Sequence, residues 1–360
     1  MKLIVIPCQT SLYTDIKKAK SLRATFDTAE TEAFRKVFQN EGWVVDVVYN
    51  DVGYTDEILK RDYDTVLLKV PGFVFYGGVL DKRTSNFLRF ISERDLNIWV
   101  VYNDCSYAFT TGCETLRRSL PKLKFADPTF TSAEALKGLE TLERMYSKGI
   151  TVVCPGGRLD FKLSKDSENL KWEMISKPEI NRNIASLFFS EIPELEQPEY
   201  DVCYAGVWRK DREIFLKNVL DDGKFQSVST CSGLKGAKKE IHLDLNLANH
   251  REIEGFKFTE QQIWYQKSLT QLVVSDPGTY GKFVSPRWFS ALRTNAVPLI
   301  QADYDFRREL LSEAPDLSFL YVENSDEVSA AVEILSEPGA RKEVLGILRN
   351  LEEPWFSSLR

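Results

Sequence analysis

Short, wholly apolar segments alternate with helix-like segments along this chain, and this alternation limits the possible folds more than any other feature. In the first half the apolar segments fall at residues 3–8, 44–49, 64–70, 98–102 and 150–154. Strands buried on both faces are apolar throughout, and strands separated by helices pair in parallel. The first half is therefore predicted to be a parallel α/β sheet with helices on both faces.

Two helices in this half have recognisable boundaries. Thr28 is predicted as the N-cap of a helix that ends at Gly42, and the glutamates that follow Thr28 support a capping box. The segment at residues 81–95 is amphipathic and is predicted to be a second helix. Its inner face carries Phe87, Leu88, Phe90 and Ile91.

The same alternation restarts in the second half, after a connector at residues 176–199 that carries Pro178, Pro193 and Pro198. Strands are predicted at residues 200–204, 226–229, 271–275 and 296–300. Helices are predicted at residues 209–220, 259–268, 286–292 and 339–350. A chain of 360 residues exceeds the size at which single cores stop growing. We therefore expect domains at 1–175 and 199–338, a linker at 176–198, and a C-terminal helix at 339–360 that returns toward the first domain.

Each domain is expected to be Rossmann-like, with its ligand outside the carboxyl ends of the strands. The two carboxyl edges are expected to face each other, which would place the active site in a cleft between the domains. Neither half carries a G-x-G-x-x-G segment after its first strand, and no Walker A motif occurs. An NAD or FAD dehydrogenase is therefore disfavoured.

Composition excludes several classes of protein. No apolar segment approaches the roughly 20 residues needed to span a bilayer, and the N-terminus lacks the length and cleavage site of a signal peptide. We expect a soluble, cytoplasmic monomer. The chain has only two histidines, and its six cysteines form no C-x-x-C pair. Zinc binding and histidine-dependent nucleophilic catalysis are therefore disfavoured, and carboxylates would carry proton transfer.

The net charge of −6 argues against a general nucleic-acid binder, because phosphate affinity comes from Lys and Arg. Cations nevertheless cluster at residues 17–23, 117–124 and 235–239. Such clusters are usually solvated loops, but three of them leave room for one basic face. The candidate DNA-contacting residues are Lys17, Lys18, Lys20, Arg23, Arg117, Arg118, Lys122 and Lys124.

One carboxylate directly follows a predicted strand at the carboxyl edge of the first sheet. This is Asp104, after the apolar segment at residues 98–102. A carboxylate in that position can act as a general base toward a hydroxyl nucleophile. The alternative is an aspartate that caps the next segment.

A pair of cations follows the first strand of the second half. Arg209 and Arg212 come after the glycine turn at Gly206, at the start of a predicted helix. Cations are unfavourable at a helix N-terminus unless an anion binds there, where backbone N–H groups and guanidiniums could share a diphosphate. The alternative is a surface pair between Arg212 and Asp211 or Glu213.

Three further features are weaker. Arg287 lies in Ser285-Pro286-Arg287-Trp288, which opens another helix on the same side of the expected cleft. Glu30 is expected near the start of the first helix, facing the cleft or solvent. The triplets Asp62-Tyr63-Asp64 and Asp303-Tyr304-Asp305 match the D-x-D metal signature, but such triplets are common and no metal site is assigned.

In collinear order over nearly the whole chain, these segments resemble the T-even bacteriophage DNA β-glucosyltransferases. The matching segments are Thr28-Ala29-Glu30-Thr31, Phe75-Tyr76-Gly77-Gly78, Val101-Tyr102-Asn103-Asp104, residues 201–212, residues 282–288, Tyr321-Val322-Glu323-Asn324 and Trp355. The resemblance implies a GT-B fold with an acceptor and DNA domain first and a nucleotide-sugar domain second. It implies inverting transfer of glucose from UDP-glucose to 5-hydroxymethylcytosine in duplex DNA. The setting would be the cytoplasm of an infected cell, where the modification protects phage DNA from host nucleases.

The resemblance also implies roles for single residues. Asp104 corresponds to the base that deprotonates the hydroxymethyl group, and Glu30 to a carboxylate that contacts the sugar. Arg209 and Arg212 correspond to the pair that holds the UDP phosphates. The other donor-site residues are Gly206, Phe256, Asp276, Arg287 and Ser290. A divalent metal is compatible with the site, but no motif requires one.

Two departures from the family leave the donor sugar open. Ser290 stands where the family has a ribose-binding glutamate, and Val207 replaces a small residue. The donor could be UDP-glucose or a UDP-pentose such as UDP-arabinose. The acidic composition keeps open a GT-B enzyme acting on a small molecule, glycan or lipid carrier. A non-catalytic, two-lobed ligand-binding protein is the third possibility.

Overall fold

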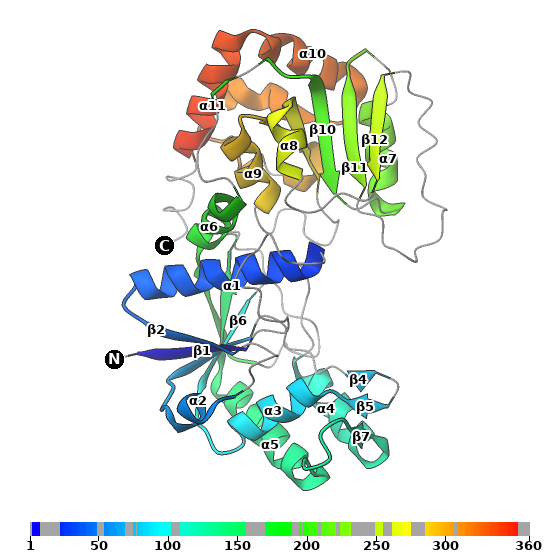
Figure 1. The fold of residues 1–360 in the computed structure, drawn as a ribbon. Coiled ribbons are helices and arrows are strands. Elements are labelled where there is room, and N and C mark those ends of the chain that lie inside the picture. The colour runs from blue at the N-terminus through cyan, green and yellow to red at the C-terminus, as the bar shows by residue number, and fades with distance from the viewer. Residues whose placement is uncertain are drawn as a thin grey trace. The chain divides into compact units, whose positions relative to one another are not determined.

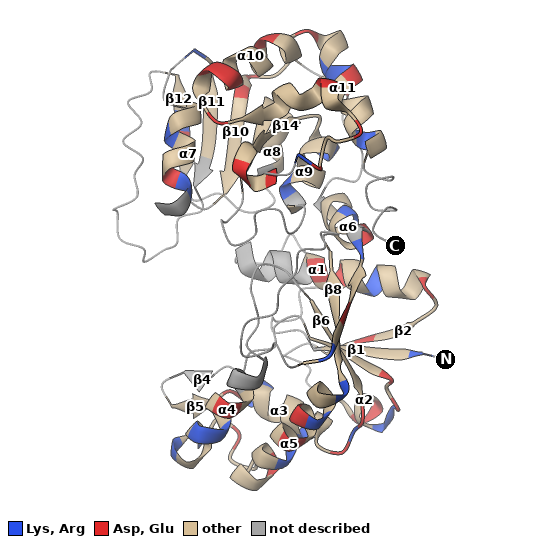
Figure 2. Ribbon diagram, turned by 180° about the vertical axis from the view of Figure 1, so that it is seen from behind, with Lys and Arg blue, Asp and Glu red and all other residues tan. Residues whose placement is uncertain are grey.

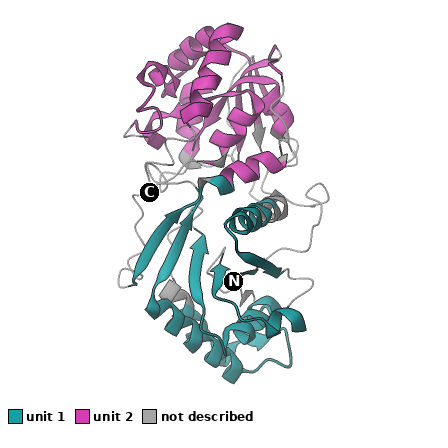
Figure 3. Ribbon diagram, turned by 90° about the vertical axis from the view of Figure 1, so that its left-hand side faces the viewer, with its two compact units in different colours: residues 1–155, 161–180 teal, residues 156–160, 181–360 magenta. Residues whose placement is uncertain are grey.

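A computed structural model describes most of the chain. The described residues are 2–7, 22–48, 54–68, 75–76, 78–101, 109–155, 170–188, 194–195, 197–206, 210–220, 224–231, 249–254, 261–274, 285–305 and 308–351. The chain divides into two compact units (Figure 3). Unit 1 holds residues 1–155 and 161–180, and unit 2 holds residues 156–160 and 181–360.

Unit 1 is built on a six-stranded sheet in which every neighbouring pair is parallel. Its order is β2-β1-β3-β6-β8-β9. The strands are β1 (Leu3–Pro7), β2 (Val44–Val48), β3 (Thr65–Leu68), β6 (Asn97–Val101), β8 (Ile150–Cys154) and β9 (Trp172–Ser176). Every residue of β3 and β8 is buried, as expected for strands covered on both faces.

Helices cover both faces of this sheet. They are α1 (Leu22–Asn40), α2 (Asp56–Lys60), α3 (Lys82–Ile91), α4 (Phe109–Ser119) and α5 (Ser132–Lys148). Helix α1 lies on one face, and α3 and α5 lie on the other (Figure 1). On the α1 side, Phe38 packs against Trp99 of β6 with ring centroids 5.4 Å apart. This aromatic contact fixes the helix that follows the first strand onto the sheet.

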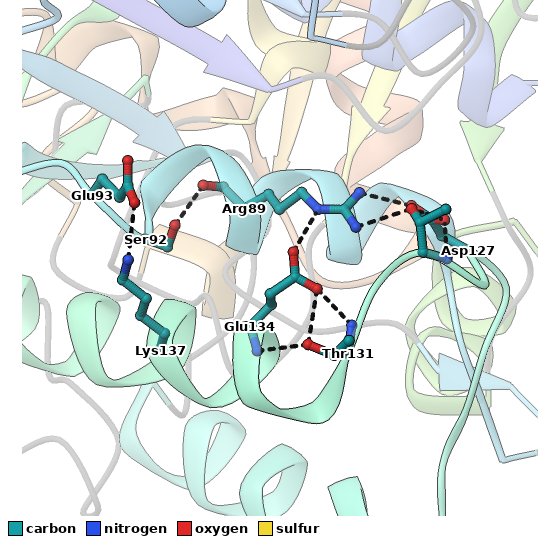
Figure 4. Close-up of polar contacts among 8 residues, drawn as sticks. Arg89, Ser92, Glu93, Asp127, Thr131, Glu134 and Lys137 are labelled. Carbon is teal, nitrogen blue, oxygen red and sulfur yellow. Dashed lines mark hydrogen bonds and ion pairs between the residues drawn. The ribbon is translucent and has the colours of Figure 1, made fainter.

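A polar network joins α3 to the start of α5 (Figure 4). The Arg89 guanidinium donates to Asp127 at 2.8 Å and to Glu134 at 3.2 Å. Glu134 also completes a capping box with Thr131, whose hydroxyl accepts from the Glu134 amide. Hydrogen bonds from Thr129 and the Arg89 guanidinium lower the pKa of Asp127 to about 2. One guanidinium thus ties a helix, a turn and a helix cap together.

A small second sheet extends unit 1. Its order is β4-β5-β7, formed by β4 (Phe75–Tyr76), β5 (Val79–Leu80) and β7 (Lys124–Phe125). The short 3-10 helix η2 (Leu120–Lys122) joins α4 to β7. Gly78 has a φ of +76°, a conformation that glycine adopts without strain, and it forms the turn into β5.

Unit 2 is built on a second six-stranded parallel sheet, of order β12-β11-β10-β13-β14-β15. The strands are β10 (Tyr200–Gly206), β11 (Ser227–Cys231), β12 (His250–Glu254), β13 (Ser268–Val273), β14 (Val297–Gln301) and β15 (Tyr321–Val322). In chain order this arrangement is 3-2-1-4-5-6, the strand order of a dinucleotide-type Rossmann sheet. The order reverses between β10 and β13.

The helices of unit 2 are α7 (Lys210–Leu220), α8 (Gln261–Gln266), α9 (Pro286–Thr294), α10 (Ser325–Ser336) and α11 (Pro338–Leu351), with 3-10 helices η6 (Ala302–Asp305) and η7 (Pro315–Leu320). Helices α8 and α9 lie on one face of the sheet and α7 and α10 on the other (Figure 1). Helix α6 (Pro178–Phe188) spans the boundary between the units in sequence. No helix in the described part of the chain is long and apolar enough to cross a membrane.

The structure confirms the predicted α/β class with two parallel sheets, but it corrects several local expectations. Helix α1 begins at Leu22, so Thr28 lies inside it and is not an N-cap. Residues 22–27 contain no Gly or Pro that would stop a helix. The expected connector at 176–199 contains α6, whose first residue is Pro178. Proline is well suited to that position because its fixed φ is helical and its missing N–H needs no partner.

Some elements were not predicted at all. They are α2, α4, α5, α6, α10, β9, β12 and β15, together with the small sheet and the 3-10 helices. Strands β9 and β12 lie at sheet edges, where one flank has no neighbouring strand among the described residues. Their sequences, WEMIS and HREIE, are accordingly mixed rather than apolar. The part of the expected returning helix that the structure describes is α11, whose Val344, Leu345 and Leu348 belong to the core of unit 2.

Candidate functional site

The strand order of unit 2 marks one place on the sheet for a ligand. In open parallel sheets, ligands bind outside the carboxyl ends of the strands, at the point where the order reverses. Here that point lies between the ends of β10 and β13, near Gly206 and Val274. Two arginines from helices on opposite faces of the sheet reach it.

Arg287 reaches the strand ends from the first turn of α9. Its Nε donates to the carbonyl oxygen of Ala205 at 3.0 Å, and its Nη1 donates to that of Val274 at 3.2 Å. The start of α9 is held by Ser285, which is the N-cap and whose amide donates to the Tyr304 hydroxyl at 2.7 Å. The guanidinium therefore bridges β10 and β13 at the reversal point.

Arg212 reaches the same strand end from the first turn of α7. Arg212 is only 6% exposed, and its Nη1 donates to the hydroxyl of Tyr204 at 3.4 Å. Tyr204 is fully buried and lies two residues before Gly206, so both residues face the same side of β10. Glu213, one of the surface partners considered for Arg212, forms an ion pair with Lys217 at 3.0 Å.

Gly206 lies where these groups meet. A Cβ atom on Gly206 would stand 2.7 Å from the Tyr204 hydroxyl oxygen and 2.9 Å from Nη2 of Arg287. Real Cβ atoms do not approach other atoms this closely, so a side chain here would displace both groups. Glycine at this position lets Tyr204 and Arg287 close around the end of the strand.

Neutral groups are among the acceptors of the two guanidiniums. Arg287 donates to backbone carbonyls, and Arg212 donates to a phenol. Burial raises the pKa of Tyr265, which interacts electrostatically with Arg287, so this phenol also remains neutral. These contacts orient the guanidiniums at the reversal point without themselves adding negative charge. A phosphate or diphosphate is the ligand that such a site favours.

The remaining predicted donor residues are placed in part. Ser290 is half-buried on α9, three residues after Arg287, so the two share a helix face. Arg209, Phe256 and Asp276 lie outside the described residues. The structure therefore brings together Gly206, Arg212 and Arg287 from the predicted set, and it adds Tyr204, which sequence reasoning missed. The signal for Tyr204 was its place two residues before Gly206 in a strand.

Of the two predicted catalytic carboxylates, the structure describes one. Glu30 lies inside α1, buried at 3% exposure, and not near the start of the helix as expected. Asp104 lies outside the described residues. The strand before it, β6, ends at Val101 and pairs with β3 and β8 in the middle of the sheet.

The predicted basic cluster at 117–124 is only partly available for an anionic partner. Arg117 is ion-paired with Glu143, and Arg118 is ion-paired with Glu114 at 3.3 Å. Figure 2 shows that acidic as well as basic residues occur in the region of α4 and α5. Lys122 and Lys124 are exposed, and neither forms an ion pair within the described part of the chain. Lys17, Lys18, Lys20 and the side chain of Arg23 lie outside what the structure describes.

In each D-x-D triplet, one aspartate accepts hydrogen bonds that stabilise the fold. Asp64 accepts a hydrogen bond from the amide of Leu3 at 2.7 Å. Asp305 is fully buried and accepts from the Tyr321 hydroxyl at 2.5 Å and from the amide of Leu310 at 2.8 Å. Among the described residues, no group of three or more His, Cys, Asp or Glu side chains is arranged to hold a metal ion.

Comparison with known proteins gives a likeness of fold. The chain matches no protein-family model and no curated protein sequence. It does match solved structures of T4 phage β-glucosyltransferase. A complex with UDP and Mn²⁺ is 18% identical, with a TM-score of 0.70 over 100% of this chain and 96% of that chain. A mutant in complex with UDP-glucose is 18% identical, with a TM-score of 0.69 over the same shares.

A third structure, described as the DNA-modifying enzyme β-glucosyltransferase in the presence and absence of its substrate, is 17% identical with a TM-score of 0.64 over the same shares. At these identities the likeness concerns the fold. The chain has the GT-B fold, with two Rossmann-like parallel sheets, and this confirms the predicted fold class.

Proposed function

We propose that this protein is an inverting glycosyltransferase that moves a sugar from a UDP-sugar to the hydroxymethyl group of 5-hydroxymethylcytosine in DNA. One observation carries the proposal. In a chain with the fold of T4 phage β-glucosyltransferase, Arg212 and Arg287 converge on Gly206 at the point of a Rossmann sheet where ligands bind.

The donor is the better supported half of the proposal. A diphosphate carries the negative charge that two adjacent guanidiniums attract, and Arg209 would add a third cation beside them. The structural neighbours were solved with UDP-glucose and with UDP and Mn²⁺, which supports a UDP-sugar donor here. A divalent ion is compatible with this donor and would neutralise further charge on the diphosphate.

The role of general base is assigned to Asp104. In the proposed step, the Asp104 carboxylate takes the proton of the hydroxymethyl O–H while that oxygen attacks the anomeric carbon. The bond from the anomeric carbon to the donor phosphate oxygen breaks, and its electron pair leaves with UDP. Arg212 and Arg287 stabilise the charge that develops on the leaving diphosphate. Glu30 is proposed to orient the sugar.

The proposed acceptor is DNA, and two observations support it. A structural neighbour is described as a DNA-modifying enzyme. Lys122 at the end of η2 and Lys124 at the start of β7 are the described cations proposed to contact DNA phosphates. Lys17, Lys18, Lys20 and Arg23 would extend that surface. The donor sugar is proposed to be glucose or a pentose such as arabinose. This choice follows from two sequence departures from the resembling family, Ser290 in place of a ribose-binding glutamate and Val207 in place of a small residue.

The deciding experiment offers the protein DNA that contains 5-hydroxymethylcytosine, with UDP-glucose or UDP-arabinose as donor. Mass spectrometry of the digested nucleosides is expected to show a product heavier by one hexose or one pentose residue. DNA with unmodified cytosine serves as the control and should show no product. UDP binding without transfer to DNA would point to a GT-B enzyme with a small-molecule, glycan or lipid acceptor. No UDP binding and no transfer would remove the proposal.

A further inference from the structure

Within the proposed function, on which this inference rests, we propose that Tyr204 is a positioning residue for the donor site. Its buried hydroxyl holds the Arg212 guanidinium in the orientation that meets the donor diphosphate. Tyr204 is not assigned a contact with the donor itself. The hydroxyl would organise the site before any ligand arrives.

The aromatic ring of Tyr204 has a fixed place. It is fully buried in the core cluster of unit 2, together with Val202 of the same strand and Leu216 of α7. Core side chains are packed at crystal-like density, so the ring cannot swing without moving its neighbours. The hydroxyl at its tip therefore stands at a constant position beside Gly206.

The hydroxyl contacts a guanidinium that is itself buried. Nη1 of Arg212 donates to the Tyr204 oxygen at 3.4 Å, and only 6% of Arg212 is exposed. An arginine side chain has many rotamers, and ordering them on ligand binding weakens affinity. A hydrogen bond that selects one rotamer in the free protein transfers this cost from binding to folding.

The chemical type of the acceptor matters as much as its position. In unit 1, Arg89 and Arg117 are held by carboxylates, which neutralise them. A phenol orients a guanidinium without itself adding a negative charge beside it. Replacing the phenol by an acidic group would orient Arg212 equally well but would cancel its charge.

Gly206 makes the arrangement possible. The Tyr204 hydroxyl and Nη2 of Arg287 both lie within 3 Å of the position that a Cβ on Gly206 would occupy. Tyr204 and Arg287 can therefore close around the strand end only because residue 206 has no side chain. The Tyr204 hydroxyl thus lies beside Gly206 at the strand end and beside the Arg212 guanidinium. Both are proposed to contact the donor.

The test uses isothermal titration of the full chain with UDP and, separately, with uridine. Tyr204→Phe keeps the buried ring and removes only the hydroxyl. We expect UDP affinity to fall by about 2- to 10-fold, the range for one hydrogen bond, and uridine affinity to stay unchanged because uridine has no phosphate. In the Arg212→Gln background, adding Tyr204→Phe should change UDP affinity by less than about twofold, because the group it positions is gone.

Two controls keep the result interpretable. Tyr321→Phe removes a buried hydroxyl in the same unit, one that bonds to Asp305, and should leave UDP affinity unchanged. Arg212→Lys retains the charge but not the geometry of the guanidinium, and it should weaken UDP binding even if Tyr204→Phe folds poorly. Thermal melting establishes that each variant is folded.

The outcomes separate the two proposals. If the unsubstituted protein does not bind UDP, the proposed donor is wrong and the role of Tyr204 falls with it. If the protein binds UDP and Tyr204→Phe binds it equally well, only the positioning role is overturned. Equal loss of UDP and uridine affinity, or full additivity with Arg212→Gln, would also overturn the positioning role.

Discussion

The carbonyl oxygen of Leu88 in α3 lies 2.7 Å from the position that a Cβ atom would occupy on Gly138 of α5. The two helices pack at this point with backbone nearly against backbone, on the face of the first sheet opposite α1 (Figure 1). The Arg89 network also joins α5 to α3. This close contact therefore sets how the helix layer formed by α3 and α5 packs.

Gly138→Ala should therefore destabilise the protein. The added methyl group meets backbone that cannot turn aside, and the strain is expected to cost about 1–3 kcal/mol in the free energy of unfolding. Gly346→Ala is the matched control, because Gly346 is also inside a helix but nothing lies within 4 Å of its Cβ position. That variant should gain up to about 1 kcal/mol from helix propensity. Chemical denaturation measures both, and equal values would contradict the close crossing.

Arg287→Met should weaken UDP binding. The substitution removes a guanidinium that is held at the ends of β10 and β13, and a charge-assisted hydrogen bond is worth about 1.5–3 kcal/mol. Affinity should therefore fall by about 10- to 150-fold in isothermal titration. Arg293→Met, near the carboxyl end of the same helix α9, is the control and should bind UDP as the unsubstituted protein does. Equal effects of the two substitutions would argue against a specific phosphate contact.

Asp104→Asn should abolish sugar transfer while UDP affinity is kept. An amide of nearly the same shape cannot accept the proton from the attacking hydroxyl, and a general base serves the transition state rather than nucleotide binding. Transfer to hydroxymethylated DNA and UDP titration measure the two effects separately. Asp95→Asn, at an exposed aspartate ion-paired with Lys148, is the control and should transfer normally. Transfer by Asp104→Asn at the normal rate would exclude Asp104 as the base.

Lys122→Gln combined with Lys124→Gln should weaken DNA binding and flatten its dependence on salt. Each lysine that contacts a phosphate contributes about 0.9 to the slope of log affinity against log salt concentration. Arg117→Gln is the comparison, since its guanidinium is ion-paired with Glu143 and should contribute less. Binding measured by fluorescence anisotropy at several salt concentrations tests this. An unchanged slope in the lysine variant would place the DNA elsewhere.

His250 predicts a pH dependence of stability. Its Nδ1 lies 2.8 Å from the Ser227 hydroxyl and its Nε2 2.9 Å from the Ser229 hydroxyl, and burial lowers its pKa from 6.5 to about 4. Between these values the unfolded chain binds a proton that the folded protein does not. Stability is therefore lost as the pH falls from about 6.5 toward 4.

The measurement compares melting temperatures at pH 7.5 and pH 5.0. His250→Gln, which keeps hydrogen-bonding groups but cannot titrate, should lose less stability than the unsubstituted protein over this interval. Other groups titrate in both proteins, so the difference between the two losses isolates His250. The same loss in both proteins would show that the imidazole is not held neutral.

Local sequence patterns were informative where burial on two faces leaves an apolar strand. The predicted strands at residues 150–154 and 200–204 correspond to β8 and most of β10. Local sequence patterns were uninformative at sheet edges such as β12, where a polar strand pairs on one side only. Helix α5 is a different case, because its capping box of Thr131 and Glu134 follows the local T-x-x-E spacing, which is a sequence signal for a helix start.

The candidate site shows the same division. The sequence by itself placed Gly206 in the turn after a strand, Arg212 in the first turn of the helix that follows, and Arg287 in the first turn of another helix, because turns, caps and helix starts are local patterns. Only the tertiary structure decided that Arg287 donates to Ala205, which is 82 residues away in the chain, and that the Tyr204 hydroxyl meets Arg212. Those contacts depend on the strand order and on which helix covers which face. Long-range packing sets both, and no pattern within a single segment encodes it.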